Sequence, residues 1–242
     1  MNSSPHQLSA IVTGASSGIG KATALALAEA GINLALVSRS LDKLEAVANE
    51  VQDLGVKAKT YPVDLAKINQ VQDQIAAIAD DFGAIDILIN NAGMGYTNSL
   101  AQTPLTDWQQ VLELNVTSVF QCIQGILPQM RDRGTGTIVN VASIAAYNAF
   151  PDWGAYSVSK AALVALSKTL AVEERANGIR VVVISPGAVN TPIWDTKTVQ
   201  ADFNREAMLT PEIVAQSILH TILLPRQAVV EEMTVMPSGG AL

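Results

Sequence analysis

The stretch TGASSGIGKATALAL, from Thr13 to Leu27, places three glycines between a short apolar run and a helix-length amphipathic segment. Gly14, Gly18 and Gly20 have the spacing G-x3-G-x-G. Glycine at such a bend accepts positive φ and lets backbone approach a ligand closely, and the following helix offers free N–H groups and a positive dipole end. The stretch predicts a strand, a phosphate-binding loop and a helix. The alternative is a tight turn that only joins the two elements.

The rest of the chain repeats this alternation of short apolar runs and helix-length segments, which is typical of βα units. Strands are expected at 8–13, 32–38, 56–64, 85–90, 136–143, 179–185 and 229–236. Helices are expected at 21–30, 41–54, 67–82, 106–131, 155–177 and from 211 onward.

The runs at 85–90, 136–143 and 179–185 are β-branched and almost unbroken. Such strands are buried on both faces, as in a parallel sheet covered by helices on each side. We therefore predict an α/β fold: one doubly wound Rossmann-type domain over residues 1–242, with about seven parallel strands. The segment 187–210 is too long for an ordinary connection and is expected to form a substrate loop or lid with short helical pieces.

Composition excludes several classes of protein. Of the 242 residues, 49% are hydrophobic and 15% charged, which excludes a disordered chain. The net charge of -7 argues against a nucleic-acid partner. The single Cys122 permits no internal disulfide, and Met1–Ala10 lacks the features of a signal peptide, so a cytoplasmic protein without a membrane span is expected. With only His6, His220 and one cysteine, no zinc-ligand spacing exists and no metal is expected.

A tyrosine and a lysine are the first candidates for chemistry. Among four tyrosines, only Tyr156 has a lysine four residues later, Lys160. That spacing puts both side chains on one face of a helix. A nearby cation favours the phenolate and lowers the pKa of the phenol from its usual value of about 10, so Tyr156 is the predicted general acid and base. An exposed pair without function is the alternative.

Polar residues follow two of the predicted strands. Ser143 ends the strand at 136–143, and the amide-rich run from Asn90 to Gly93 ends the strand at 85–90. Ligands of open α/β sheets bind at the carboxyl ends of strands, so both groups are expected beside a substrate and a cofactor. Asn115 lies inside a helical stretch, where its amide is either functional or a satisfied core group.

The end of the second strand carries information about the cofactor. A carboxylate there binds a ribose 2′-hydroxyl, whereas a basic side chain receives a 2′-phosphate. The residues present are Ser38, Arg39 and Ser40, with no acid, which favours NADP(H) over NAD(H). Arg39 as an ordinary solvated charge is the alternative.

Six elements now stand in order along the chain: T-G-x3-G-x-G at 13–20, N-N-A-G at 90–93, Asn115, Ser143, Y-x3-K at 156–160, and P-G at 186–187 followed by Thr191. With them the sequence resembles a short-chain dehydrogenase/reductase over essentially its whole length. The resemblance implies that Tyr156 transfers the proton and that Ser143 orients the substrate oxygen. Lys160 would lower the pKa of the tyrosine and bind the nicotinamide ribose, and Asn115 would hold a water that links Lys160 to solvent.

The resemblance also implies the cofactor contacts. Asp64 would contact adenine, and Thr191 with the backbone near Val189 would hold the carboxamide. Ser17 occupies a position where many NADPH-using relatives carry a second basic residue. The full set expected to contact the cofactor is Gly14, Ser16, Ser17, Gly18, Ile19, Gly20, Ser38, Arg39, Asp64, Leu65, Asn91, Ala92, Gly93, Tyr156, Lys160, Pro186, Gly187, Val189 and Thr191.

Apolar and aromatic residues are expected to form the substrate pocket beside Ser143: Met94, Tyr96, Tyr147, Phe150, Trp153 and Trp194, with Phe203 and Met208 nearby. They favour reduction of a hydrophobic ketone or aldehyde. One alternative is a 3-oxoacyl-[acyl-carrier-protein] reductase, for which Arg131 and Arg133 could form a basic docking rim. Another is a non-catalytic dinucleotide sensor. The family further suggests a homotetramer, or a homodimer, formed through the helices at 106–131 and 155–177.

Overall fold

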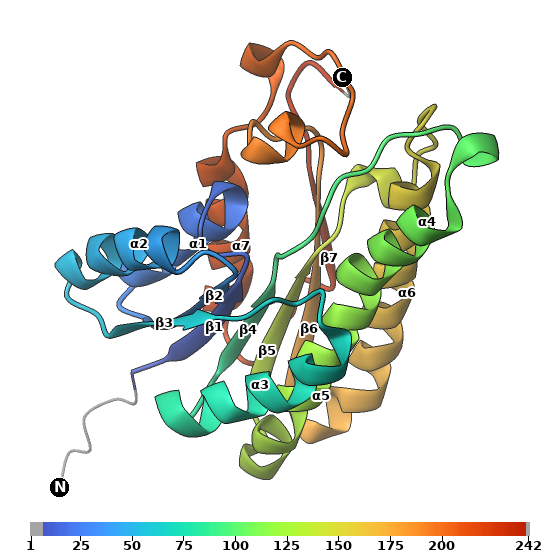
Figure 1. The fold of residues 1–242 in the computed structure, drawn as a ribbon. Helices are drawn as coiled ribbons and strands as arrows, with labels where there is room; N and C mark the ends of the chain where they lie inside the picture. The colour runs from blue at the N-terminus through green and yellow to red at the C-terminus, as the bar shows by residue number, and fades with distance from the viewer. Residues whose placement is uncertain (1–6, 241–242) are drawn as a thin grey trace, which may run out of the picture.

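The computed structural model describes residues 7–240, so the amino-terminal expectations at 1–6, His6 included, lie outside the described part (Figure 1). Seven strands form one parallel sheet in the order β3-β2-β1-β4-β5-β6-β7. The predicted doubly wound α/β fold is thereby confirmed. The strands are β1 (Ser9–Thr13), β2 (Asn33–Ser38), β3 (Ala58–Pro62), β4 (Ile87–Asn90), β5 (Gly136–Val141), β6 (Ile179–Pro186) and β7 (Glu232–Val235).

The outermost strands are shorter than their apolar runs suggest. The predicted strand 56–64 is paired only over β3, which ends at Pro62 opposite Ser38. The run 229–236 is paired only over β7. An edge strand has only one neighbour, so each of these strands ends where its pairing with that neighbour ends.

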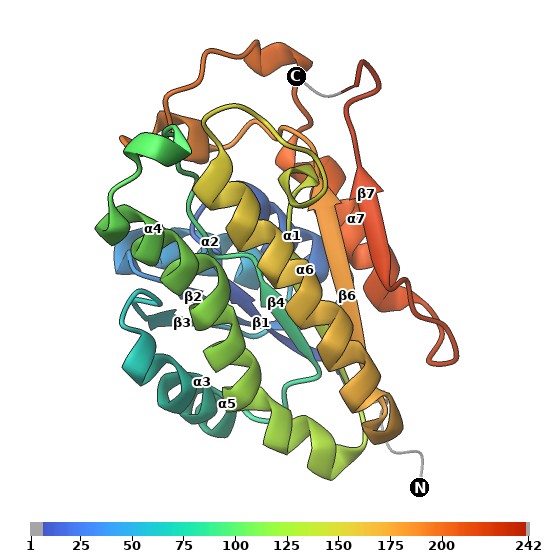
Figure 2. The same cartoon turned by 90° about the vertical axis from the view of Figure 1, so that its right-hand side faces the viewer.

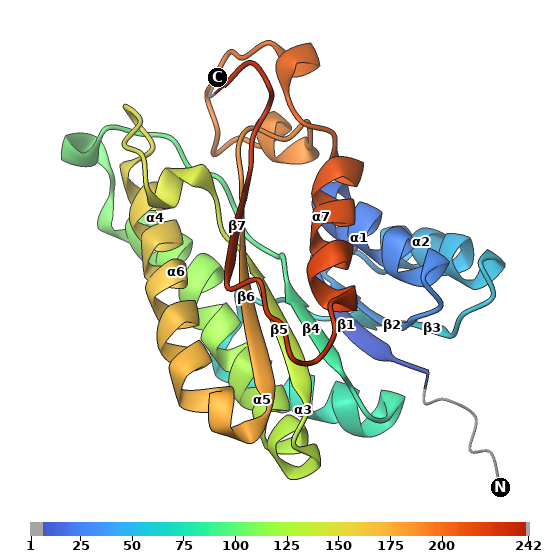
Figure 3. The ribbon, with the colours of Figure 1, turned by 180° about the vertical axis from the view of Figure 1, so that it is seen from behind.

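Helices cover both faces of the sheet (Figures 2 and 3). On one face lie α1 (Gly18–Glu29), α2 (Leu41–Asp53) and α7 (Pro211–Leu223). On the other lie α3 (Ile68–Phe82), α4 (Leu105–Leu112), α5 (Ser118–Arg133) and α6 (Gly154–Glu174). Within residues 7–240, no helix is both long enough and apolar enough to cross a bilayer.

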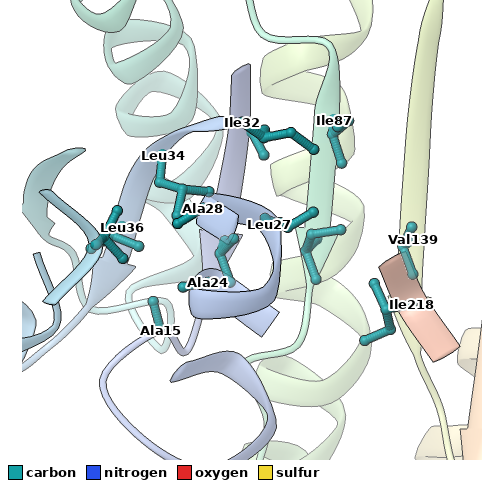
Figure 4. Close-up of a cluster of buried hydrophobic side chains, with 14 of the residues drawn as sticks. Ala15, Ala24, Leu27, Ala28, Ile32, Leu34, Leu36, Ile87, Val139 and Ile218 are labelled. Atoms are coloured by element: carbon teal, nitrogen blue, oxygen red, sulfur yellow. The ribbon is translucent and has the colours of Figure 1, made fainter. Parts of the chain in front are cut away.

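The core between α1 and the sheet explains how α1 is held (Figure 4). Ala24, Leu27 and Ala28 of α1 belong to a buried cluster with Leu34 and Leu36 of β2. Burying a leucine fully contributes about 1.5–3 kcal/mol, while the alanines allow the helix to lie close to the strands. This packing sets the position of the α1 amino terminus, where the glycine-rich loop ends.

The predicted helical segment 106–131 is present, but it is divided into α4 and α5 by a π-helical insertion. Residues Glu113–Thr117 form a π-helical segment between α4 and α5, and the chain stays helical through it. A π segment has one more residue per turn than an α-helix and is found frequently at functional sites. Here the segment contains the buried Asn115. Hydrophobic periodicity cannot reveal such an insertion, because the apolar pattern continues on either side of it.

The sheet order reverses between β1 and β4, so the connections after these two strands leave in opposite directions and open a crevice at their carboxyl ends. The segment 187–210 crosses this edge of the sheet, at the top in Figure 1. It contains two short 3-10 helices, Pro192–Asp195 and Arg205–Ala207.

Candidate active site

The glycine-rich loop turns tightly against the chain that leaves β4. Gly14 and Gly18 have φ of +67° and +52°, which side chains other than glycine rarely adopt. A Cβ on Gly14 would lie 2.8 Å from Asn91 Nδ2. Gly20 serves a different purpose, because a Cβ there would lie 2.2 Å from the carbonyl oxygen of Gly14. Gly20 therefore lets α1 approach the loop and does not line the ligand cavity, contrary to expectation.

Thr13 and Asn91 join the ends of β1 and β4. The Thr13 hydroxyl donates to the carbonyl oxygen of Ile89 (3.1 Å) and accepts from the backbone N–H groups of Asn91 (3.0 Å) and Ala92 (3.1 Å). In return, Asn91 Nδ2 donates to the carbonyl oxygen of Thr13 (3.1 Å). These bonds fix two loops as one rigid floor at the switch point of the sheet.

A cavity of about 960 Å³ opens along this floor, at the upper end of the roughly 300–1,000 Å³ common for ligand sites. It runs from the end of β2, past the glycine loop, to the ends of β5 and β6. Every residue expected to contact the cofactor lines it except Gly20. Of the expected substrate residues, the lining set includes Met94, Ser143, Phe150, Trp153, Trp194 and Phe203.

Tyr156, Ser143 and Lys160 meet at one end of this cavity. Tyr156 and Lys160 lie one turn apart on α6, with Lys160 Nζ 5.6 Å from the centre of the tyrosine ring. The Ser143 hydroxyl hydrogen-bonds the phenol and accepts from the backbone N–H of Ala145 (3.1 Å). Ser143 lies two residues after β5, which ends at Val141 and not at 143 as predicted, and it caps the 3-10 helix Ile144–Ala146, so its side chain has a fixed orientation.

The pKa values at this end follow burial. Burial raises the pKa of Tyr156 above its ordinary value, and the hydrogen bond from Ser143 opposes that rise. The pKa of this phenol is therefore raised and not lowered as expected. Lys160 is itself 6% exposed, and burial lowers the pKa of its ammonium group to about 8. Its Nζ donates to the carbonyl oxygen of Val141 at 2.9 Å.

Asn115 supports the site from behind. Its Oδ1 accepts from the backbone N–H of Met94 (2.8 Å), and its Nδ2 donates to the Met94 carbonyl oxygen (2.9 Å) and to Ser159 Oγ (3.0 Å). A Cβ on Gly93 would lie 3.0 Å from Asn115 Oδ1 and 3.7 Å from Lys160 Nζ. The side chain is a satisfied core amide that does not line the cavity and connects α4–α5 to α6.

The far end of the cavity is basic and rich in hydroxyls. Ser38, Arg39 and Ser40 line it together with Lys43 of α2, which the sequence reasoning missed. The spacing of four residues between Arg39 and Lys43 at a helix start was the available signal. Among residues 7–240 the Ser38 hydroxyl has no hydrogen-bond partner although it is buried. A buried hydroxyl without a partner is costly, which favours a ligand group at this end.

Two tyrosines expected in the substrate pocket lie elsewhere. The Tyr96 side chain packs beneath the cavity against α4, and its hydroxyl donates to Asp107 (2.9 Å). Tyr147 is 46% exposed and hydrogen-bonds Glu232 of β7. Nearness in sequence to the site predicts both rings in the pocket, but each hydroxyl has a carboxylate partner that holds it away. Met208 does not line the cavity either, whereas Gln110, Leu114, Ile193, Thr196 and Thr198 do.

Among the described residues no group of three or more His, Cys, Asp or Glu side chains could hold a metal ion.

The short chain dehydrogenase profile matches residues 9–202, most of the chain. The chain belongs to the short-chain dehydrogenase/reductase family. As a member of this family it is an oxidoreductase, and the six sequence elements that suggested the resemblance all lie along the cavity or directly behind it.

Relatives in the family differ in what they bind. The chain is 37% identical to a 3-oxoacyl-[acyl-carrier-protein] reductase of Staphylococcus epidermidis over 202 residues, 83% of this chain and 82% of that protein. It superposes with a TM-score of 0.88 on an alcohol dehydrogenase of Thermococcus sibiricus complexed with 5-hydroxy-NADP (29% identity; 96% and 97% of the two chains). It superposes with a TM-score of 0.87 on a 7α-hydroxysteroid dehydrogenase complexed with NADH and 7-oxo glycochenodeoxycholic acid (30% identity; 97% and 94% of the two chains).

Proposed function

We propose that this short-chain dehydrogenase/reductase transfers hydride between NADP(H) and a carbonyl/alcohol pair, reducing hydrophobic ketones or aldehydes with Tyr156 as general acid and base. The observation that carries the proposal is the convergence of Tyr156, Ser143 and Lys160 at one end of a cavity whose other end carries Arg39 and Lys43. The likeness to an alcohol dehydrogenase complexed with a 5-hydroxy-NADP supports it.

The residues present fit a dinucleotide. Gly14 and Gly18 line the cavity where α1 begins, so the pyrophosphate would bind there beside the free N–H groups of the first helical turn. Thr191 and the backbone near Val189 would hold the carboxamide, and Lys160 the nicotinamide ribose. When bound, the cofactor supplies or accepts the hydride at C4 of its nicotinamide.

The protein's own residues then manage the oxygen and its proton. Ser143 donates a hydrogen bond that holds the carbonyl oxygen beside Tyr156, because its own oxygen already accepts from Ala145. Burial keeps the pKa of Tyr156 high, so the phenol is protonated at neutral pH and can donate to the oxygen as negative charge develops. Lys160, with a pKa of about 8, can exchange a proton in the working range.

The decisive test is a panel of hydrophobic ketones and aldehydes assayed with NADPH and NADH side by side. Tyr156→Phe should bind NADPH nearly as tightly as the parent protein but lower turnover by at least ~10²-fold, the scale of a lost general acid. A variant that keeps most of its turnover refutes the role of Tyr156. Tight NADPH binding with no oxidation across the whole panel would instead support the non-catalytic sensor.

The preference for NADP(H) rests on Arg39, Lys43 and the buried Ser38 hydroxyl. A 2′-phosphate offers these donors charged oxygens, whereas a ribose hydroxyl does not. Arg39→Ala should therefore raise the KM for NADPH much more than the KM for NADH. Lys59→Ala, whose lysine pairs with Asp81 outside the cavity, is the control. Equal changes for both cofactors contradict the assignment.

The 3-oxoacyl-[acyl-carrier-protein] reductase reading is the second candidate, and the similarity to the Staphylococcus epidermidis enzyme favours it. Its expected docking rim is absent from the cavity mouth. Arg131 is paired with Glu174. Arg133 donates to the carbonyl oxygen of Ile85, just before β4 begins, and so lies at the amino-terminal ends of the strands, whereas the cavity lies at their carboxyl ends. Activity on a carrier-protein thioester but not on free ketones would establish this alternative.

We further propose a homotetramer in the cytoplasm. The α5–α6 side carries exposed apolar residues, Phe120 (41%), Val158 (42%) and Val172 (71%), and burying them between subunits is favourable. Ala161 and Ala165 on α6 would allow helices to pack closely. The lone Cys122 is buried and unpaired, as suits a reducing compartment. Light scattering gives the subunit number directly: four supports the proposal, two the homodimer, and one contradicts both.

A further inference from the structure

Four aromatic rings form a continuous series along the substrate end of the cavity. Tyr156 contacts Trp153 edge-to-face, with ring centres 5.3 Å apart at 70°. Trp153 contacts Trp194 (5.7 Å, 68°), and Trp194 contacts Phe203 (5.4 Å, 80°). All four line the cavity. We refer to Trp153, Trp194 and Phe203 as the aromatic wall; it connects the start of α6 to the segment 187–210.

The aromatic wall is held before any ligand arrives. Trp194 Nε1 donates to the carbonyl oxygen of Val189 at 2.7 Å, which fixes the indole. The Arg205 guanidinium donates to Asn190 Oδ1 (2.8 Å), to the Thr191 carbonyl oxygen (3.0 Å) and to Asp195 (3.2 Å), on both sides of Trp194. A rigid aromatic surface loses little conformational freedom on binding, which makes it selective for ligand shape.

Among the described residues, no charged side chain lines the cavity beside the aromatic wall, since Arg205 and Asp195 lie outside the lining. The four charged residues that line the cavity among those described are Arg39, Lys43, Asp64 and Lys160. Three of them lie at the adenosine end, and Lys160 lies behind Tyr156. A carboxylate or phosphate on the substrate would lose its hydration beside these rings without gaining a counter-charge. The cavity therefore selects an uncharged substituent.

We propose that Trp153, Trp194 and Phe203 determine specificity for uncharged aryl ketones and aldehydes, in which an aromatic ring is attached directly to the carbonyl carbon. The inference rests on the proposed function. Tyr156 holds the carbonyl oxygen, and Trp153, the ring in contact with Tyr156, reaches a substituent one bond away from that carbonyl. An aromatic substituent extends the edge-to-face series. An aromatic pair increases affinity by about 2- to 13-fold beyond the effect of burying the same apolar area.

The experiment compares acetophenone with cyclohexyl methyl ketone, which has the same number of carbon atoms but a saturated ring. The quantity measured is the ratio of their kcat/KM values with NADPH. Comparing this ratio between variants cancels the difference in intrinsic reactivity. Trp153→Leu and Trp194→Leu should each lower the ratio by about 2- to 13-fold, and Trp194→Phe, which keeps a ring, should restore most of it.

Trp108→Leu is the matched control, because Trp108 lies on α4 outside the cavity lining and should leave the ratio unchanged. If Trp153→Leu does not fold, Phe203→Leu in the segment 187–210 provides the second variant. A ratio that is the same in the parent protein and in the Trp194 and Phe203 variants overturns the inference. Benzoylformate, an acetophenone analogue with a carboxylate, should be at least about tenfold poorer than acetophenone, and equal rates would also overturn it.

Failure of this inference differs from failure of the proposed function. If the parent protein reduces both ketones, Tyr156→Phe abolishes both activities and the ratio does not respond to the aromatic wall, only the aryl specificity is wrong. If the parent protein reduces no carbonyl compound in the panel, the proposed function itself is wrong.

Discussion

Replacing Lys160 with methionine should make the protein without ligand more stable while removing its activity. Lys160 is 6% exposed, and burial lowers its pKa from 10.5 to about 8. Since one pKa unit corresponds to about 1.4 kcal/mol, the folded state loses about 3 kcal/mol below pH 8 by burying this cation. Methionine has nearly the same shape but gives up the hydrogen bond to Val141, a loss of about 1 kcal/mol. The net expectation at pH 7 is a gain of about 2 kcal/mol.

The pH dependence gives the prediction its sign. Below pH 8 the lysine is charged in both the folded and the unfolded protein, and the full cost of burial applies. Between about pH 8 and 10.5 the folded protein releases the proton while the unfolded chain retains it, so the parent protein gains stability as pH rises. The advantage of Lys160→Met should therefore shrink above pH 8 and vanish at about pH 10.

Urea unfolding at pH 7, 8, 9 and 9.5, followed by circular dichroism, measures this difference. Lys197→Met, at an exposed position in the segment 187–210, is the control and should change stability little at any of these pH values. A Lys160→Met protein that is less stable than the parent at pH 7 would refute the reasoning. So would a stability difference that does not change with pH.

Two further substitutions test how the site is supported. Gly20→Ala puts a Cβ 2.2 Å from the Gly14 carbonyl oxygen, so it should lower stability by about 1–3 kcal/mol and weaken NADPH binding. The control is Gly239→Ala, which should do neither because nothing lies within 4 Å of its Cβ. Thermal unfolding with and without NADPH measures both effects. Arg131→Met leaves the buried Glu174 carboxylate without its counter-charge and should lower stability at pH 7. Arg131 holds the pKa of Glu174 below its usual range, so the ion pair stabilises the protein at neutral pH and ceases to do so on acidification. Denaturation curves from pH 7 down to pH 4 should show the stability difference between parent and variant shrinking. A difference that stays constant would contradict this account.

Tyr147 and Lys43 illustrate where sequence reasoning failed. Tyr147 follows Ser143 closely along the chain, yet its hydroxyl turns to Glu232, which is 85 residues later in the numbering. Lys43 is 117 residues before Lys160, yet both line the same cavity. Distance along the chain predicts contacts only within an element, and both errors concern contacts between elements.

The amino-acid sequence alone determined the order of strands and helices, because the hydrophobic pattern of each segment reflects whether it is buried on one face or two. It also determined the chemical groups at the strand ends, since motif residues such as Gly14, Ser143 and Tyr156 occupy positions that the local backbone defines. The tertiary structure alone decided the environment of those groups. Whether Lys160 is charged, whether Asn115 faces a ligand or the core, and which aromatic rings touch one another depend on burial and on contacts between distant segments, which no local pattern encodes.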